Sequence, residues 1–316
     1  MISRNRILLF LKGMAMGAAD SVPGVSGGTI ALITNIYEEL IDAIKAVGPG
    51  VLQTWHKEGL GAAWREINGS FLLTLLLGIL SALLLLGRLI LVVMDSHLPL
   101  LLAFFSGLVL ASIYFVTRQV KLWSFSALCL FTAGIALAIV LATLPLADSS
   151  DNLLYYFFCG SVAICAMILP GISGAFILVL LGVYGPVLEA LTGFDWQVIT
   201  VFGAGCIVGL MLFSRVLSWL LHAYHDLTLS ALIGLLVGSL YLLWPWRVAT
   251  ELNLNSHAFI RYQHVLPGEY ARLTGEAVSP VLVLLVVAVG AALVLALEFV
   301  ACPVKGSEQK DPEAEV

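Results

Sequence analysis

The chain has 316 residues, of which 60% are hydrophobic and only 11% are charged, and its formal net charge is −5. Because soluble domains carry about 25% charged residues, this composition excludes an ordinary water-soluble domain and predicts an all-α polytopic membrane protein. The sequence contains no basic block that would indicate nucleic acid as a partner. Its five cysteines show no C-x-x-C spacing, which argues against a disulfide framework or a zinc site.

The first element is an apolar segment from Ile7 to Ala19, which leads into a phrase of small residues, Pro-Gly-Val-Ser-Gly-Gly, at 23–28. A second copy, Pro-Gly-Ile-Ser-Gly-Ala at 170–175, follows a comparable apolar segment at 153–168. A basic and then apolar N-terminus can indicate a signal peptide. The internal copy instead indicates that the first segment belongs to a repeated structural unit.

Each phrase interrupts an apolar stretch that continues on its far side, at 29–44 and at 176–191. These arms are shorter than the roughly 20 residues that a spanning helix needs. We therefore predict two re-entrant hairpins, at 7–44 and 153–191, each made of two half-helices joined by a non-helical turn. Such backbone is tolerated at membrane depth only where protein or water covers it.

The two halves of the chain can be aligned well beyond the phrase. At an offset of 147, which aligns Pro23 with Pro170, the residues in register include Gly24, Ser26, Gly27, Ile30, Tyr37 and Ala43. After a polar loop at about 45–68 the offset becomes 127, and the residues in register include Gly78, Arg88, Gly107, Ser112 and Tyr114. An arginine, serines, tyrosines and several glycines in register predict an internal repeat rather than chance matches between apolar residues.

Six further segments are long and apolar enough to cross a bilayer. They are 71–93, 99–116 and 122–144 in the first half, and 198–221, 229–246 and 278–301 in the second. The predicted organisation is a first repeat at 1–147, a second repeat at 150–302 and a disordered cytoplasmic tail at 303–316, with both repeats forming one membrane domain.

Three crossings per half is an odd number, and a re-entrant hairpin adds none, so the second half is predicted to insert upside down relative to the first. A cytoplasmic N-terminus places most of the basic residues inside: Arg4, Arg6, Lys12, Lys45, Lys57, Arg65, Arg118, Lys121, Lys305 and Lys310. Arg247, Arg261 and Arg272 then lie outside, in agreement with the positive-inside bias, and the C-terminus is also cytoplasmic. The charge count does not distinguish re-entrant hairpins from fully crossing ones.

Small polar residues lie where each outgoing half-helix begins. They are Ser26, Gly27, Gly28 and Thr29 in the first copy, and Ser173 and Gly174 in the second. Free N–H groups at helix N-termini and nearby hydroxyls suit a phosphate, so these residues are candidate phosphate ligands. The alternative is that the serines only cap the half-helices while the glycines permit close packing.

Arg88 and Arg215 occupy matching places within predicted spans, near the outer and the inner end respectively. A guanidinium binds phosphate with two parallel hydrogen bonds, so one arginine on each side of the membrane would suit a lipid phosphate that approaches from either leaflet. The alternative is that both side chains reach the nearest membrane interface.

Several other polar residues flank the two phrases. Asp20 and Glu38 are candidates for coupling to H+ or Na+, although Asp20 could also pair with an arginine. Tyr37, Tyr184 and Glu189 are secondary candidates for the site. His222, His225 and Asp226 resemble a metal cluster but lack a fourth ligand, so no metal and no cofactor is predicted.

The stretch from Gly13 to Thr29, GMAMGAADSVPGVSGGT, resembles the signature of the PopT-type undecaprenyl-phosphate translocases. The resemblance extends over about residues 6–302. It implies a multi-pass protein of the bacterial cytoplasmic membrane that binds undecaprenyl phosphate or a related polyprenyl phosphate. Such a flippase returns the carrier lipid from the outer to the inner leaflet for re-use in peptidoglycan and other envelope glycans.

Two other classes of function stay open at this point. The phrase partly resembles that of undecaprenyl-pyrophosphate phosphatases of the bacitracin-resistance type, but Gly27 and Gly28 stand where that motif needs Arg and Ser. We therefore predict a protein that is not an enzyme. A small-anion secondary transporter of the same architecture is the third alternative, and the sequence leaves open whether the chain forms a homodimer.

Overall fold

The computed structural model describes residues 2–21, 26–147, 150, 152–251 and 261–301. Over these residues the fold is helical, with one two-stranded antiparallel sheet, so the predicted all-α class is confirmed. The tip of the first hairpin, at 22–25, and the predicted tail at 303–316 lie outside the described residues.

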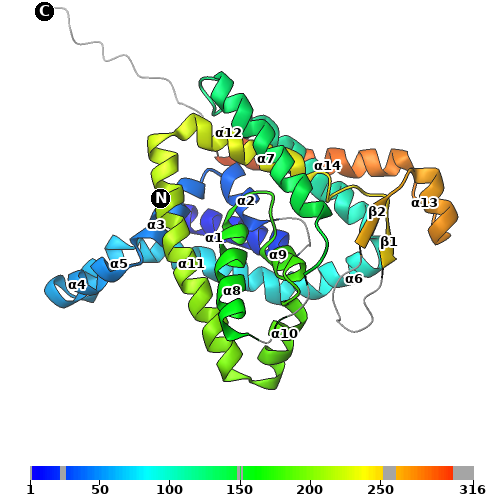
Figure 1. Cartoon of the computed structure of the whole chain (residues 1–316). Coiled ribbons are helices and arrows are strands. Elements are labelled where there is room, and N and C mark those ends of the chain that lie inside the picture. Colours follow the sequence, from blue (N-terminus) through cyan, green and yellow to red (C-terminus); the bar gives the residue numbers. More distant parts are fainter. Residues whose placement is uncertain (1, 22–25, 148–149, 151, 252–260, 302–316) are drawn as a thin grey trace, which may run out of the picture.

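Figure 1 shows the helices and strands that the described residues form along the two halves of the chain. The first half contains α1 (Ile2–Asp20), α2 (Gly27–Ile33), α3 (Tyr37–Ala46), α4 (Pro49–Glu58), α5 (Leu60–Glu66), α6 (Gly69–Thr117) and α7 (Phe125–Thr143). The second half contains α8 (Leu153–Ile168), α9 (Gly174–Leu180), α10 (Tyr184–Gly193), α11 (Trp196–Ala223), α12 (His225–Ser239), β1 (Arg247–Glu251), β2 (Arg261–His264), α13 (Pro267–Thr274) and α14 (Pro280–Ala301).

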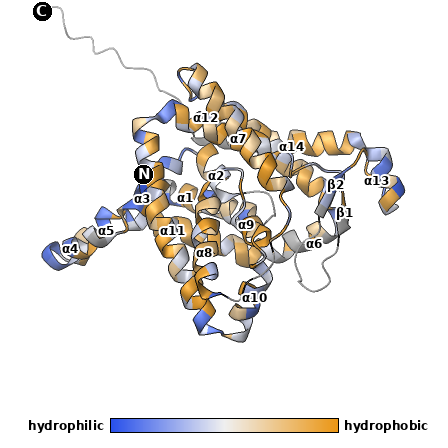
Figure 2. Ribbon diagram, in the orientation of Figure 1, coloured by the Kyte–Doolittle hydropathy of each residue, from blue (hydrophilic) through white to orange (hydrophobic). Residues whose placement is uncertain are grey.

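Among the described residues, four helical segments are long and apolar enough to cross a membrane: Gly69–Gly87, Ser96–Thr117, Phe125–Thr143 and Trp196–Ala223. A fifth span is added if α9 and α10, which are bent by 105°, are counted as one. The predicted spans at 229–246 and 278–301 coincide with shorter apolar helices, His225–Ser239 and Pro280–Ala296. Figure 2 shows hydrophobic residues along α7, α8, α11 and α14, and hydrophilic residues toward α4 and α13.

The first two predicted spans are joined into α6, a single helical element of 49 residues. Its backbone leaves the helical region at His97, where φ is −143° and ψ is 40°. Pro99 follows two residues later. Proline has no N–H to donate to the helix, and its ring clashes with the carbonyl group four residues earlier. The two predicted spans are therefore separated by a kink within α6 and not by a separate loop.

The outgoing arm of each hairpin was predicted as one half-helix, and this was wrong. The arm at 29–44 consists of α2 and α3, and the arm at 176–191 consists of α9 and α10. Asn35 and Gly182, which are in register, both adopt positive φ, 55° and 68°. A residue in the left-handed region ends a helix, so each arm breaks at the same place.

Close helix packing through glycine is also repeated. A Cβ at Gly78 of α6 would collide with the carbonyl oxygen of Phe10 in α1, and a Cβ at Gly205 of α11 would collide with that of Phe157 in α8. Small residues let two backbones approach closely, which is a common way to join helices in membranes. The helix before each phrase is therefore held against the next long helix by an equivalent contact.

The later helices of the two halves pack across the repeat boundary. The second part of α6 packs against α14, and α12 packs against α7. Gly107 lies against the carbonyl of Val287 in α14, while Gly234, its match in the second half, lies against the carbonyl of Phe131 in α7. The two halves are therefore interlocked into one helical body.

The segment at 45–68, predicted as a polar loop, is largely helical and forms α4 and α5. Figure 1 shows these helices projecting from the body at the opposite edge from β1, β2 and α13. The strands pair in antiparallel fashion between α12 and α14, and the sequence analysis did not predict them.

Candidate functional site

The two copies of the repeated phrase meet inside the protein. The Ser26 hydroxyl donates to the backbone oxygen of Met167 at 3.1 Å, and the Tyr37 hydroxyl donates to that of Ile168 at 3.3 Å. The Gly171 N–H in turn donates to the Thr29 hydroxyl at 3.1 Å. Residues more than 130 positions apart in the sequence thus form one hydrogen-bonded centre.

This centre is closed to solvent. Ser26 and Thr29 are each 1% exposed, and Ser173 is 6% exposed. A Cβ at Gly28 would collide with the carbonyl oxygen of Ile168, and a Cβ at Gly174 would lie 2.7 Å from that of Ala163. A side chain larger than glycine is therefore excluded at Gly28, where the two copies touch, and at Gly174, which packs against α8 of its own hairpin.

Both serines cap the half-helices that follow them. The Ser26 hydroxyl accepts from the Gly28 N–H at 3.1 Å, and the Ser173 hydroxyl accepts from the Phe176 N–H at 3.5 Å. The capping role that was the alternative interpretation is therefore present in the structure. It uses the same hydroxyl groups that were predicted to contact a phosphate.

A carboxylate occupies the start of α2. The Gly27 N–H donates to Oδ1 of Asp20 at 2.6 Å, and the Asp20 carboxylate lies where a Cβ of residue 27 would be. Asp20 is the last residue of α1, so the incoming and outgoing arms of the first hairpin are linked through this contact. An anion that binds to the Gly27 N–H would have to replace this carboxylate.

Of the two predicted arginines, only Arg215 has a described side chain, and its contacts lie away from the repeated phrases. Arg88 lies within α6, but its side chain is outside the described residues. The guanidinium of Arg215, in α11, donates to the carbonyl of Met211 and lies beside Gly48, between α3 and α4. The described contacts of Arg215 are thus with its own helix and with the segment at 45–68, which has almost no counterpart in the second half and is called the insertion below.

The secondary candidates occupy different environments. Tyr37 is 2% exposed and belongs to the hydrogen-bonded centre. Tyr184 is half-buried at the start of α10, and Glu189 is exposed. Glu38 faces α12 rather than the tips, as described next.

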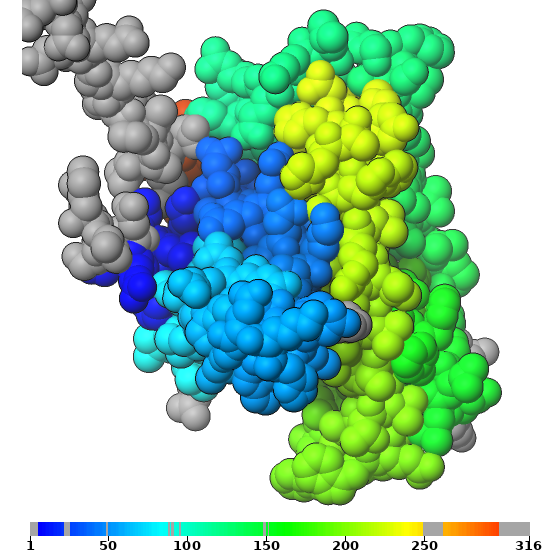
Figure 3. All heavy atoms as spheres, turned by 90° about the vertical axis from the view of Figure 1, so that its left-hand side faces the viewer, coloured from blue at the N-terminus to red at the C-terminus, as the bar shows by residue number. Residues whose placement is uncertain are grey.

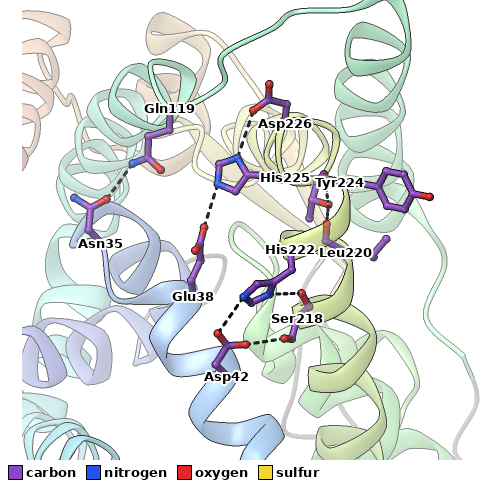
Figure 4. A network of polar contacts seen from close by, with 11 residues as sticks. Asn35, Glu38, Asp42, Gln119, Ser218, Leu220, His222, Tyr224, His225 and Asp226 are labelled. Atoms are coloured by element: carbon purple, nitrogen blue, oxygen red, sulfur yellow. Dashed lines mark hydrogen bonds and ion pairs between the residues drawn. The ribbon is translucent and has the colours of Figure 1, made fainter.

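A second polar group joins α3 to the corner between α11 and α12 (Figure 4). Glu38 Oε1 lies 3.1 Å from Nε2 of His225, and Asp42 Oδ2 lies 3.7 Å from Nε2 of His222. The Ser218 hydroxyl donates to Asp42 at 2.6 Å. Figure 3 shows α3 and the insertion packed against α11 and α12 on this side of the molecule.

The sequence analysis did not detect this group. It considered Glu38 only as a candidate for ion coupling and the two histidines only as metal ligands. The described residues contain no group of three or more His, Cys, Asp or Glu side chains that could hold a metal ion. The four-residue spacing of Glu38 and Asp42 is a signal that could have been used, because it places both acids on one helix face.

A cavity of about 430 Å³ opens beside this group. Its lining includes Lys121, His222, Tyr224, His225 and Asp226. Partial desolvation raises the pKa of Asp226, but hydrogen bonds from the N–H of Leu122 and from His225 outweigh it, so the pKa lies below its ordinary value. Asp226 is therefore ionised at neutral pH.

Comparison with known proteins gives two kinds of result. A family described as undecaprenyl phosphate translocase-like matches residues 16–260. A polyprenyl-phosphate transporter of Vibrio cholerae is 41% identical over 297 residues, which cover 93% of this chain and 96% of that protein. A polyprenyl-phosphate transporter of Staphylococcus aureus is 30% identical over 253 residues, which cover 74% and 85%.

No solved structure matches the chain. The family match covers more than half of the sequence and includes the first phrase, from Met16 onward. The long apolar helices agree with a multi-pass membrane protein. The chain belongs to the undecaprenyl phosphate translocase-like family.

Proposed function

We propose that this protein carries undecaprenyl phosphate, or a closely related polyprenyl phosphate, from the outer to the inner leaflet of the bacterial cytoplasmic membrane. The strongest support is the 41% identity to a polyprenyl-phosphate transporter over nearly the full length of both chains. A phosphate headgroup needs a polar path through the protein, while its polyprenyl tail can stay in the lipid. Transport would return the carrier for re-use in envelope glycan synthesis.

In this proposal the two halves are inverted repeats that alternate access around the joined hairpin tips. Equivalent helix breaks at Asn35 and Gly182 and equivalent glycine contacts at Gly78 and Gly205 support the repeat. Transporters of this design bind substrate near the middle of the membrane at broken helices. The two phrases are joined by side chain to backbone hydrogen bonds and by one apolar core that includes Ile30 and Ile172, so opening would separate both kinds of contact.

The phosphate would bind when the tips open. Ser26, Gly27, Gly28, Thr29, Ser173 and Gly174 would supply N–H and hydroxyl groups, and Arg88 and Arg215 would guide the anion on its two sides. Asp20 then acts as an internal competitor for the Gly27 N–H. Uptake of H+ or Na+ at Asp20 would weaken its hold on that N–H, so the same residue could couple an ion to phosphate entry.

The lack of space for side chains at positions 27 and 28 disfavours a hydrolytic function. The phosphatase-type phrase needs Arg and Ser at positions 27 and 28. Here a Cβ at Gly27 would meet the Asp20 carboxylate, and a Cβ at Gly28 would meet the Ile168 carbonyl. The larger catalytic side chains do not fit this arrangement.

The decisive experiment uses the purified protein in liposomes that contain labelled undecaprenyl phosphate. We expect the labelled undecaprenyl phosphate to move between the leaflets. In a parallel assay with undecaprenyl pyrophosphate, we expect no release of inorganic phosphate. Steady phosphate release would favour the enzyme instead. If transport is coupled to an ion, Asp20→Asn should change how the transport rate responds to a pH or Na+ gradient. A wild-type transport rate that is the same with and without either gradient would indicate passive transport.

A further inference from the structure

The two histidines at the α11–α12 corner each have both ring nitrogens facing acceptors. Nε2 of His225 lies 3.1 Å from Glu38, and its Nδ1 lies 3.4 Å from Oδ1 of Asp226. Nδ1 of His222 lies 2.8 Å from the carbonyl oxygen of Ser218, and its Nε2 lies 3.7 Å from Asp42. A neutral imidazole has only one N–H, so only the protonated ring can donate on both sides.

We propose that His222 and His225, with Asp42 and Glu38, form a proton-binding site that latches α3 of the first half to α11 and α12 of the second. Each histidine binds one proton between acceptors that come from different helices (Figure 4). Imidazole is the side chain that serves most often as a pH-dependent switch in proteins. The cavity beside Lys121 and Tyr224 gives solvent protons direct access.

The charges around the site agree with this assignment. Besides the two acids of α3, the carboxylate of Asp226 faces the site from α12, while Lys45 donates to Ser218 at 3.1 Å and Lys121 lines the cavity. With both imidazoles neutral, three carboxylates face two ammonium groups, which leaves an excess of one negative charge. Two bound protons change this to an excess of one positive charge. Proton binding therefore relieves repulsion between α3 and α12.

The latch is connected to the hairpin tips through one short helix. Tyr37, the first residue of α3, bonds to Ile168 at the tips, and Glu38 and Asp42 on the same helix make the latch. A displacement of α3 would therefore act at both places. In this proposal the doubly donating imidazoles join α3 to α11 and α12, so lower pH favours the latch and rising pH releases it.

The test is amide hydrogen exchange of α3 in the full-length protein in liposomes, at about pH 6 and about pH 8, corrected for the pH dependence of chemical exchange. We expect protection of residues 37–46 to fall about three- to tenfold at the higher pH, as two partly exposed ion pairs allow. The double variant His222→Gln and His225→Gln should lose this pH dependence, and Glu38→Gln should reduce it. The matched control is Gln119→Ala, which breaks the neutral contact to Asn35 at the same interface and should keep the wild-type pH response.

An unchanged protection in the wild type, or an equal fall in the double variant, would overturn the latch. The single variant Glu38→Gln keeps the test open if the double variant does not fold. The latch rests on the proposed transport only for its purpose, so the two can fail separately. The expected fall in protection at the higher pH, without movement of labelled undecaprenyl phosphate at either pH, would reject transport alone. Movement of the labelled lipid without pH-dependent exchange would reject the latch alone.

Discussion

At the scale of single residues, the most constrained positions are the glycines and hydroxyls at which the two phrases touch. Gly28 lies against the Ile168 carbonyl, whereas Ala175, its match in the second copy, is exposed. The same phrase can therefore carry alanine in one half but not in the other. The difference follows from which copy lies over the carbonyl at the end of α8.

This contact predicts that Gly28→Ala destabilises the protein. The added Cβ has no room and must displace backbone, which costs about 1–3 kcal/mol in a packed interior. Thermal unfolding in detergent, followed by tryptophan fluorescence, should show a lower Tm. Gly61→Ala in α5, where a Cβ meets nothing within 4 Å, is the control and should leave the Tm unchanged or slightly higher. Equal Tm values for the two variants would contradict the packing described here.

At the scale of elements, the repeat is expressed as helix pairs held at glycine. The pair formed by α1 and α6 and the pair formed by α8 and α11 use glycines in register. Helices in lipid gain little from hydrophobic burial against each other, so close backbone approach supplies much of the attraction. At these crossings the size of a side chain should therefore affect stability more than its hydrophobicity does.

Two neighbouring glycines in α11 allow a matched test. Gly205 lies against the Phe157 carbonyl, whereas a Cβ at Gly203 would meet nothing within 4 Å. We expect Gly205→Ala to lower the free energy of unfolding by about 2 kcal/mol through overpacking, and Gly203→Ala to raise it by up to about 1 kcal/mol through helix propensity. Chemical denaturation in mixed micelles measures both. The element-scale account fails if the two substitutions have effects of the same sign and size.

At the scale of the whole molecule, the structure brings together segments that the charge pattern assigned to one side of the membrane. The Asn35–Gln119 contact joins the turn between α2 and α3 to the loop after α6, and the Leu122 N–H in that loop donates to Asp226 at the α11–α12 corner. The insertion and the β1–β2 hairpin lie at opposite edges of the fold (Figure 1). The predicted inverted repeat with cytoplasmic termini stays a prediction, which labelling from the two sides of the membrane can test.

Single cysteines on a background without the five native cysteines test this topology. In intact cells, a membrane-impermeant maleimide should label Gly268→Cys in α13. Lys121→Cys and His56→Cys should react only after the membrane is permeabilised. Labelling of all three positions from the same side would exclude the proposed orientation.

Much of the architecture could be predicted because it depends on local pattern. Apolar length predicted the spans in α6, α7 and α11, and small residues predicted the breaks at the phrases. The break at Asn35 was missed because its left-handed conformation has no strong signal in a residue other than glycine. The short α12 was predicted too long, because apolar residues continue past Ser239 into non-helical turns.

The candidate site could be predicted only in part. The doubled phrase identified Ser26, Thr29 and Tyr37, which do meet the second copy. The contact of Asp20 with the Gly27 N–H and the position of Arg215 beside Gly48 depend on how distant helices pack. No spacing in the sequence encodes such contacts directly.

The sequence by itself determined the membrane class, the register of the two halves and the family, because composition, period and signature are properties of the chain order. Only the tertiary structure decided that the doubled phrases close on each other and that α3 pairs its acids with His222 and His225. These contacts join residues that are far apart in the chain. Their geometry depends on backbone approach at glycine and on helix breaks, which follow from packing of the whole fold and not from any local pattern.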